Sequence, residues 1–286
     1  MPTLYIVGTP IGNLEDLTPR AARILSEVAL VAAEDTRVTR RLLNHLGIKP
    51  RTTSFHQHNW REKLDGVLGE LVEGDVALVT DAGMPGISDP GSELVLAASR
   101  AGFKVEVVPG ASAVTAALAL SGFAGDAFSF LGFLPRRKKD RQLSLRASLD
   151  SIAPLVIFEA PHRLRATLTD LDVVFEDRPL AVCRELTKLH EEVFRGTAAE
   201  GLEHFNSPRG EVVIVIQGRP IDATPKSEVD LADAQAHVED DLREKLSQLK
   251  QDGVRAKDAV ALVAEATGLA KNLVYQVWVE LGRESG

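Results

Sequence analysis

A short apolar segment followed by a long, rigid loop is the feature that most constrains what this sequence can fold into. Residues 76–79 read Val-Ala-Leu-Val, and residues 81–91 contain three glycines and two prolines. An apolar run bounded in this way predicts a buried strand that opens into an irregular loop. An ordinary strand-to-helix turn, with Ser92 as the helix N-cap, is the simpler alternative. Such turns usually span about 2–6 residues, so the greater length favours a binding loop at the carboxyl end of a strand.

Two further strands are expected to end in loops of the same kind. The apolar run at 4–7 breaks at 8–13, and the run at 105–108 ends in Pro-Gly-Ala-Ser-Ala at 109–113. Alternation of strands and helices predicts a parallel sheet, in which such loops can converge on one crevice. The other elements expected in this half are a strand at 28–33 and helices at 18–27, 39–46, 61–72 and 92–101.

A second α/β block starts near residue 128, and its sheet is expected to be partly antiparallel. Its strands are predicted at 154–158, 180–183, 191–195 and 211–216, and its helices at 137–149, 162–171 and 197–205. The fold class is therefore α/β, with two α/β domains at 1–118 and 119–220 and a small all-α extension at 226–286. The extension reads as helix, turn at Gly268, helix, which resembles a helix-turn-helix. A helical hairpin used only for packing is an equally good interpretation, because this segment carries a net charge of −4.

Composition limits the class of protein and its surroundings. The chain has 286 residues, of which 44% are hydrophobic, and a formal net charge of −8. A polyanionic partner would therefore have to meet a local basic patch. The single cysteine, Cys183, excludes an internal disulfide and fits a reducing compartment. No apolar run near 20 residues and no signal-peptide pattern occur, so we expect a cytoplasmic protein without membrane contact.

The loops do not carry the standard phosphate-binding motifs. Neither G-x-G-x-x-G nor G-x-x-x-x-G-K-[ST] occurs, which disfavours ATP hydrolysis and a standard dinucleotide site. A cationic or zwitterionic nucleoside would suit Asp81 and Asp89. The pair His56 and His58 is a weak metal signal, and we expect no metal. Ser112 lies outside any G-x-S-x-G elbow, so a nucleophilic serine is not indicated.

Two charged segments are candidates for contact with a substrate. Residues 134–141 together with Arg146 contain six cations and one acid, a local charge of +5 in an acidic protein. A solvated helix face would look similar, but the position beside the domain boundary favours a phosphate clamp. The second segment, 183–192, begins where a buried strand ends and supplies Glu185 and Lys188, although an exposed loop would look the same. The residues predicted to bind RNA phosphates are Arg136, Arg137, Lys138, Lys139 and Arg141.

Six ordered motifs resemble those of small-subunit ribosomal RNA methyltransferases, a branch of the tetrapyrrole methylase superfamily. Two of them are Thr-Asp-Ala-Gly-Met-Pro-Gly-Ile-Ser-Asp-Pro-Gly at 80–91 and Phe-Glu-Ala-Pro-His-Arg at 158–163. The resemblance covers about residues 3–218, and the tail resembles the helix-turn-helix-like extension of the same proteins. The other four motifs lie at 4–17, 33–37, 109–113 and 184–188.

The resemblance implies two α/β domains of the tetrapyrrole methylase type, S-adenosylmethionine in the cleft between them, and a homodimer. The implied reaction is 2′-O-methylation of a cytidine ribose in the decoding region of 16S rRNA, within an assembled small ribosomal subunit. Ala160 stands where relatives often have serine, and Trp60 stands where a glutamate is expected. The residues that the resemblance assigns to the cofactor are Pro10, Asp81, Gly83, Met84, Ser88, Ser112 and Ala113, with Ala160 and Val213 from the second domain.

Methyl transfer to a hydroxyl requires in-line positioning and the removal of one proton. We take Lys188 or Glu185 as the proton acceptor or orienting group, because both follow a buried strand of the second domain. Two rival interpretations stay open at this point. One is a small-molecule, tetrapyrrole-type methyltransferase on the same fold, since a fold does not fix its substrate. The other is an RNA-binding module that uses the C-terminal helix pair.

Overall fold

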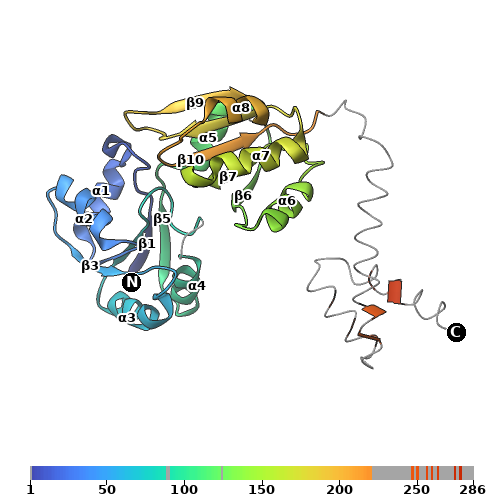
Figure 1. The fold of residues 1–286 in the computed structure, drawn as a ribbon. Helices are drawn as coiled ribbons and strands as arrows, with labels where there is room; N and C mark the ends of the chain where they lie inside the picture. The colour runs from blue at the N-terminus through green and yellow to red at the C-terminus, as the bar shows by residue number, and fades with distance from the viewer. Residues whose placement is uncertain are drawn as a thin grey trace. The chain divides into compact units, whose positions relative to one another are not determined.

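The computed structural model describes residues 2–87, 91–123 and 125–220, together with ten residues between 246 and 278. The chain divides into two compact units, Met1–Ile221 and Asp222–Gly286 (Figure 1). In the second unit, Leu246, Val263 and Val274 are buried in one small apolar cluster. Most of the extension expected at 226–286 lies outside the described residues. Among the helices that the structure describes, none is long and apolar enough to cross a membrane.

The first half of the larger unit is built on a five-stranded sheet in the order β3-β2-β4-β1-β5 (Figure 1). Every neighbouring pair is parallel, which confirms the predicted sheet. Its edge strand β3 was not expected, because it reads Arg-Thr-Thr-Ser and carries no apolar signal. The strands are β1 (Thr3–Val7), β2 (Leu30–Ala33), β3 (Arg51–Ser54), β4 (Val76–Val79) and β5 (Lys104–Val108).

Helices cover both faces of this sheet. Helices α1 (Pro19–Glu27) and α2 (Thr36–His45) pack on one face, and α3 (Trp60–Glu73) and α4 (Ser92–Arg100) pack on the other. The α1 N-terminus is capped by Thr18, whose hydroxyl accepts a hydrogen bond from the Ala21 N–H. Strands β1 and β4 are neighbours, yet the helices that follow them lie on opposite faces. This arrangement opens a crevice at the carboxyl ends of β1 and β4, where α/β sheets bind ligands.

The second half is built on a mixed five-stranded sheet in the order β6-β7-β10-β8-β9. Strands β6 and β7 are parallel and the other pairs are antiparallel, which confirms the partly antiparallel prediction. Strand β6 was not predicted. The strands are β6 (Ser129–Phe133), β7 (Leu155–Glu159), β8 (Leu180–Arg184), β9 (Glu192–Gly196) and β10 (Val212–Ile216).

The two faces of the second sheet are covered differently. Helices α6 (Lys138–Arg146), α7 (Leu164–Phe175) and α8 (Ala198–His204) pack on one face, and two 3-10 turns, η1 (Leu14–Asp16) and η2 (Pro161–Arg163), complete the larger unit. Helix α5 (Ala113–Ser121) lies on the other face, in contact with β8, β9 and β10. The domain boundary expected after residue 118 falls inside α5.

An apolar layer and a hydrogen bond join the two halves of the larger unit. Ile11, from the loop after β1, is buried with residues of α5 and with Val156 and Val213 of the second sheet. Nearby, the Asn13 N–H donates to Thr187 Oγ1 at 2.9 Å. The loop after β1 is therefore held against the loop after β8, which lies 174 residues away along the chain.

Candidate cofactor and acceptor site

A cavity of about 460 Å³ lies where strands of both sheets end. This volume falls within the usual range of small-molecule sites, about 300–1,000 Å³. The first half contributes residues after β1, β2, β4 and β5, and the second half contributes residues from β6, β7, β8 and β10. The lining includes Ile11, Glu34, Thr80, Asp81, Ala82, Gly83, Met84, Ile87, Ser112, Ala113, Val114, Phe133, Phe158, Glu159, Ala160, Pro161, Cys183, Leu186, Glu211, Val212 and Val213.

The three loops predicted from the sequence meet at this cavity through their backbones. The Thr9 N–H donates to the Gly83 carbonyl at 2.9 Å, and the Gly83 N–H donates back to the Thr9 carbonyl at 3.2 Å. A Cβ atom on Gly8 would lie only 2.7 Å from the Gly110 Cα. Because no other residue fits at that approach, glycine is required where the first loop passes the third.

Carboxylates line the cavity, and none of its lining residues that the structure describes is a lysine, arginine or histidine. Glu34 accepts a hydrogen bond from the Thr80 hydroxyl at 2.6 Å and one from the Asp81 N–H at 3.2 Å. Asp81 Oδ1 accepts from the Asp35 N–H at 3.0 Å. Burial, followed by the nearby Glu34 carboxylate, raises the pKa of Asp81. Such a wall suits a positively charged ligand and disfavours a phosphate.

Most of the residues assigned to the cofactor lie together here. Pro10 is not among the lining residues, although its neighbour Ile11 is. Ser88 lies outside the described residues. The predicted residues that line the cavity are Asp81, Gly83, Met84, Ser112, Ala113, Ala160 and Val213. Sequence reasoning did not single out Glu34 or Glu159, although each belongs to one of the motifs that carry the family resemblance.

Glu185 and Lys188 form a small ion-pair network beside the cavity. Lys188 Nζ lies 3.0 Å from Glu185 Oε1 and 2.9 Å from Glu211 Oε2, and of these three residues only Glu211 lines the cavity. Partial burial lowers the pKa of Lys188, but the hydrogen bonds to Glu211 and Glu185 outweigh burial and raise it overall. Burial raises the pKa of Glu185, but hydrogen bonds from the Glu211 N–H and Lys188 lower it overall. Lys188 is therefore a cation at neutral pH.

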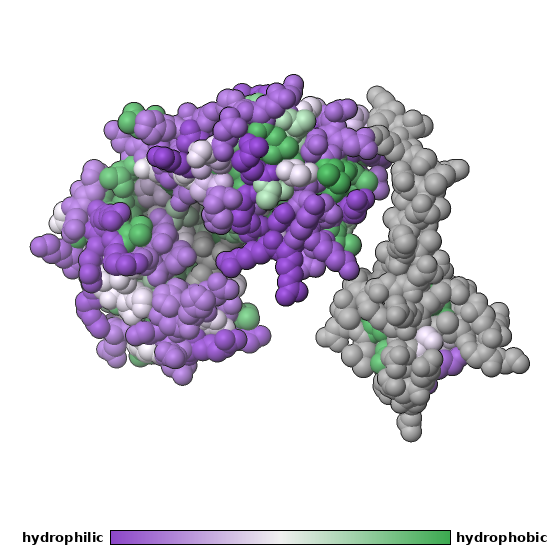
Figure 2. All heavy atoms as spheres, viewed as in Figure 1, coloured by the Kyte–Doolittle hydropathy of each residue, from purple (hydrophilic) through white to green (hydrophobic). Residues whose placement is uncertain are grey.

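The predicted RNA-binding cations separate into an exposed group and one buried residue. Arg136, Arg137, Lys138 and Lys139 are exposed, and strongly hydrophilic side chains project from this part of the second half in Figure 2. Arg141 is only 6% exposed, and its Nε donates to Asp170 Oδ2 at 2.7 Å. Its guanidinium also donates to the Arg136 carbonyl at 3.2 Å. Arg141 therefore holds the base of the basic segment, and its guanidinium does not face solvent.

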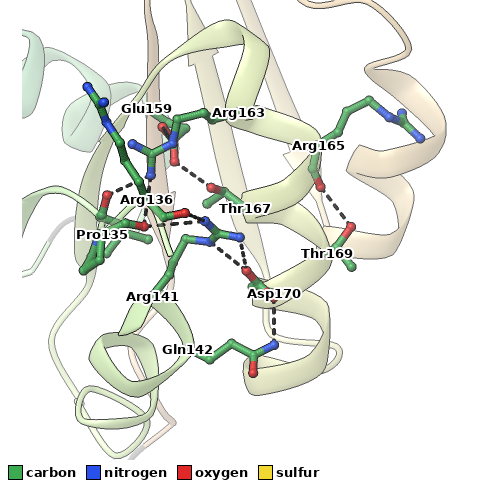
Figure 3. A network of polar contacts seen from close by, with 11 residues as sticks. Pro135, Arg136, Arg141, Gln142, Glu159, Arg163, Arg165, Thr167, Thr169 and Asp170 are labelled. Atoms are coloured by element: carbon green, nitrogen blue, oxygen red, sulfur yellow. Dashed lines mark hydrogen bonds and ion pairs between the residues drawn. The ribbon is translucent and has the colours of Figure 1, made fainter. Parts of the chain in front are cut away.

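Buried polar contacts connect this basic segment with the cavity wall (Figure 3). Glu159 lines the cavity and accepts hydrogen bonds from the Ala160 N–H at 2.8 Å and the Thr167 hydroxyl at 2.6 Å. Arg163 lies 3.1 Å from Glu159 and donates to the Leu134 carbonyl at 2.7 Å. Arg163 thus links Glu159 of the cavity wall to the backbone directly after β6.

Comparison with known proteins agrees with this architecture. Residues 3–201 match the family Tetrapyrrole (Corrin/Porphyrin) Methylases, and residues 236–282 match the RsmI C-terminal HTH domain. A solved diphthine synthase superposes with a TM-score of 0.59 at 17% identity, over 76% of this chain and 90% of that one. A uroporphyrin-III-C-methyltransferase from Thermus thermophilus gives 0.54 at 24% identity, over 75% and 94%. The fold is that of the tetrapyrrole methylases, which use S-adenosylmethionine.

Curated relatives narrow this class. The Ribosomal RNA small subunit methyltransferase I of Synechocystis is 44% identical over 285 residues, which span 98% of this chain and 99% of the relative. The protein of the same name from Thermotoga maritima is 49% identical over 222 residues, 77% of this chain and 100% of the relative. This chain belongs to the ribosomal RNA small subunit methyltransferase I family, as the motif resemblance predicted. The Thermotoga relative is about as long as the larger unit alone.

Proposed function

We propose that this protein transfers a methyl group from S-adenosylmethionine to the ribose 2′-oxygen of a cytidine in the decoding region of 16S rRNA. The observation that carries the proposal is the juxtaposition of an acid-lined cavity with an exposed basic segment. The cavity suits a cationic nucleoside, and the segment suits a phosphate backbone. Family membership supports the same reaction. We also propose, from the family resemblance, that the enzyme is a cytoplasmic homodimer acting on the assembled small subunit.

The residues of the cavity fit the proposed cofactor. S-adenosylmethionine supplies a methyl group that is already activated on a sulfonium. Glu34 and Asp81 provide negative charge for a cationic ligand, and the loops after β1, β4 and β5 offer backbone groups at a close approach. We therefore assign cofactor binding to the predicted residues that line the cavity. Among these predicted residues Asp81 alone has a carboxylate, and we assign it to balance the ligand's positive charge.

On the acceptor side, we propose that Lys188 is an orienting group. A lysine held between Glu185 and Glu211 with a raised pKa keeps its proton at neutral pH, so it is a poor proton acceptor. It can instead fix Glu211 at the cavity wall and attract the acceptor strand. Glu185 keeps Lys188 in place and stays ionised. Positioning of the 2′-oxygen then provides most of the rate, and the single proton that the hydroxyl loses on methylation passes to water.

Substitution of Lys188 tests this role. We expect Lys188→Ala to lower the single-turnover rate on small subunits about 10²-fold, because a misplaced acceptor loses in-line geometry. Lys188→Arg should recover part of the rate, since it keeps the charge between Glu185 and Glu211. Lys188 should cause no rise in the wild-type rate between about pH 7 and pH 9. Its raised pKa leaves the side chain charged throughout that window. A normal rate for Lys188→Ala, or a Lys188-dependent rise in that window, would contradict the assignment.

The substrate class is tested by reversing charge in the basic segment. The double variant Arg136→Glu with Arg137→Glu should weaken RNA binding and reduce the slope of log K against log salt by about 0.7 for each phosphate that the protein no longer neutralises. S-adenosylmethionine affinity should be unchanged, because neither residue lines the cavity. The matched control is Arg23→Glu on α1, an exposed arginine of the first half. A tetrapyrrole-type methyltransferase, the alternative interpretation, would be indifferent to the charge reversal.

Methylation mapping of small subunits treated with the enzyme identifies the nucleotide.

A further inference from the structure

Strand β6 contains an irregularity at its cavity end. Its parallel register with β7 pairs Phe130 with Val156, and then shifts so that Gly132 pairs with Ile157 and Phe133 with Phe158. Leu131 is the extra residue of this bulge. Gly132 adopts a φ of 64°, a left-handed conformation that favours glycine. Bulges of this kind are frequent next to active sites, where they redirect a side chain.

The bulge decides which face of the sheet Phe133 occupies. Side chains directly opposite each other on neighbouring strands point to the same face, and successive residues alternate. With a regular register, Gly132 would oppose Phe158 and Phe133 would point to the opposite face. The extra residue instead puts Phe133 on the face of Phe158, which lines the cavity. The Phe133 and Phe158 ring centroids are 5.6 Å apart, with the rings tilted by 58°.

Phe133 is held at the cavity but is not buried there. It lines the cavity, yet 57% of its surface is exposed, whereas the next residue, Leu134, is buried. A phenylalanine has no polar group that would gain from water, so this exposure leaves much of the ring uncovered by the residues that the structure describes. Phe130 also contacts Phe158, with 4.9 Å between the ring centroids. Phe158 therefore packs against both Phe130 and Phe133.

The exposed ring is close along the chain to the exposed cations. Arg136 is three positions after Phe133, so their Cα atoms lie at most about 10–11 Å apart. The intervening backbone is anchored, because Arg163 donates to the Leu134 carbonyl and Arg141 donates to the Arg136 carbonyl. In Figure 3 the Arg136 side chain extends away from these contacts. An aromatic ring followed within a few residues by cationic side chains is a combination that can recognise a base and its flanking phosphates.

We propose that Phe133 stacks on the base of the acceptor nucleotide, while residues 136–139 hold the neighbouring phosphates. The inference rests on the proposed function and names the element that would present the ribose to the cavity. Single-stranded RNA is recognised in this way, by bases stacked on aromatic side chains beside a basic backbone track.

The test compares Phe133→Leu and Phe133→Trp with wild type in methyl transfer to small subunits that lack the modification. Loss of one stacked base corresponds to roughly a 5- to 150-fold change, so kcat/KM for RNA should fall by that factor in Phe133→Leu. The fall should come mainly from KM. Phe133→Trp should retain or exceed wild-type values, because it keeps an aromatic face. S-adenosylmethionine affinity, measured by calorimetry, should stay within about twofold in both variants.

Several outcomes would overturn the inference, and the activity of the wild-type enzyme distinguishes its failure from failure of the proposed function. Leu143→Ala alters an exposed apolar residue of α6 and should leave both measurements unchanged. If Phe133→Leu weakened S-adenosylmethionine binding and left KM for RNA unchanged, the ring would serve the cofactor's adenine instead. Equal activity of Phe133→Leu and wild type would show that no stacking occurs. If the wild-type enzyme methylated no small-subunit RNA at all, the proposed function itself would fail.

Discussion

Replacing Gly8 with alanine is expected to weaken the binding of S-adenosylmethionine severely. The new Cβ would lie 2.7 Å from both the Gly110 Cα and the Gly110 nitrogen, a distance that real Cβ atoms do not show. The Gly8 N–H donates to the Val108 carbonyl at 2.9 Å, and Thr9 is paired with Gly83, so the first loop cannot move without disturbing the other two. Because all three loops line the cavity, we expect the Kd to rise by at least about 10²-fold, measured by calorimetry.

A matched glycine distinguishes this steric effect from a general effect of alanine. Gly66 lies within α3, and a Cβ there would meet no atom within 4 Å. Gly66→Ala should therefore bind S-adenosylmethionine normally and should gain about 0.5–1 kcal/mol in the free energy of unfolding, since alanine loses less backbone entropy in a helix. Gly8→Ala should still show a cooperative thermal transition, because the sheet beneath the loops is unchanged. Normal cofactor affinity in a folded Gly8→Ala variant would refute the assignment of these loops.

The sequence was most informative where a local signal coincides with the tertiary environment. The central strands β1, β2 and β4 are apolar runs because both of their faces are covered by helices. A continuous apolar run therefore predicts a strand that is buried on both faces. Strand β3 is a polar edge strand, and its pairing with β2 depends on a neighbour rather than on its own residues. Strand β6 was missed for another reason. Its bulge and Gly132 interrupt the alternation that predicts a strand.

The candidate site shows the same contrast between residues with a local sequence signal and residues whose role depends on distant partners. Loops with many glycines and prolines signal a close backbone approach, so the cofactor side could be predicted from residues such as Gly83 and Met84. The roles of charged side chains could not, because they depend on partners distant in sequence. Arg141 resembles its exposed neighbours in the sequence, but Asp170, 29 residues away, holds it in the interior. Lys188 is likewise governed by Glu211, which lies 23 residues further on.

Asp170→Ala is expected to be the most destabilising single substitution in the second half. Asp170 is 1% exposed, and its two oxygens accept hydrogen bonds from Arg141 Nε and from Gln142 Nε2, each at 2.7 Å (Figure 3). Removing the carboxylate leaves the Arg141 guanidinium buried without a counterion. Breaking one side of a buried pair typically costs about 3–5 kcal/mol, and we expect the free energy of unfolding in urea to fall by that amount.

The double variant Asp170→Leu with Arg141→Met determines whether the pair stabilises the fold or organises the basic segment. Apolar replacement of both partners removes the uncompensated charge, so most of the stability should return. The Arg136 carbonyl would still lack its donor, and KM for RNA should therefore rise while S-adenosylmethionine affinity holds. The exposed pair of Arg23 and Glu27 is the control, and Glu27→Ala should change stability by less than about 1 kcal/mol. If the double variant recovered both stability and KM, the buried pair would be structural only, and the orientation of residues 136–139 would not depend on the Arg141 side chain.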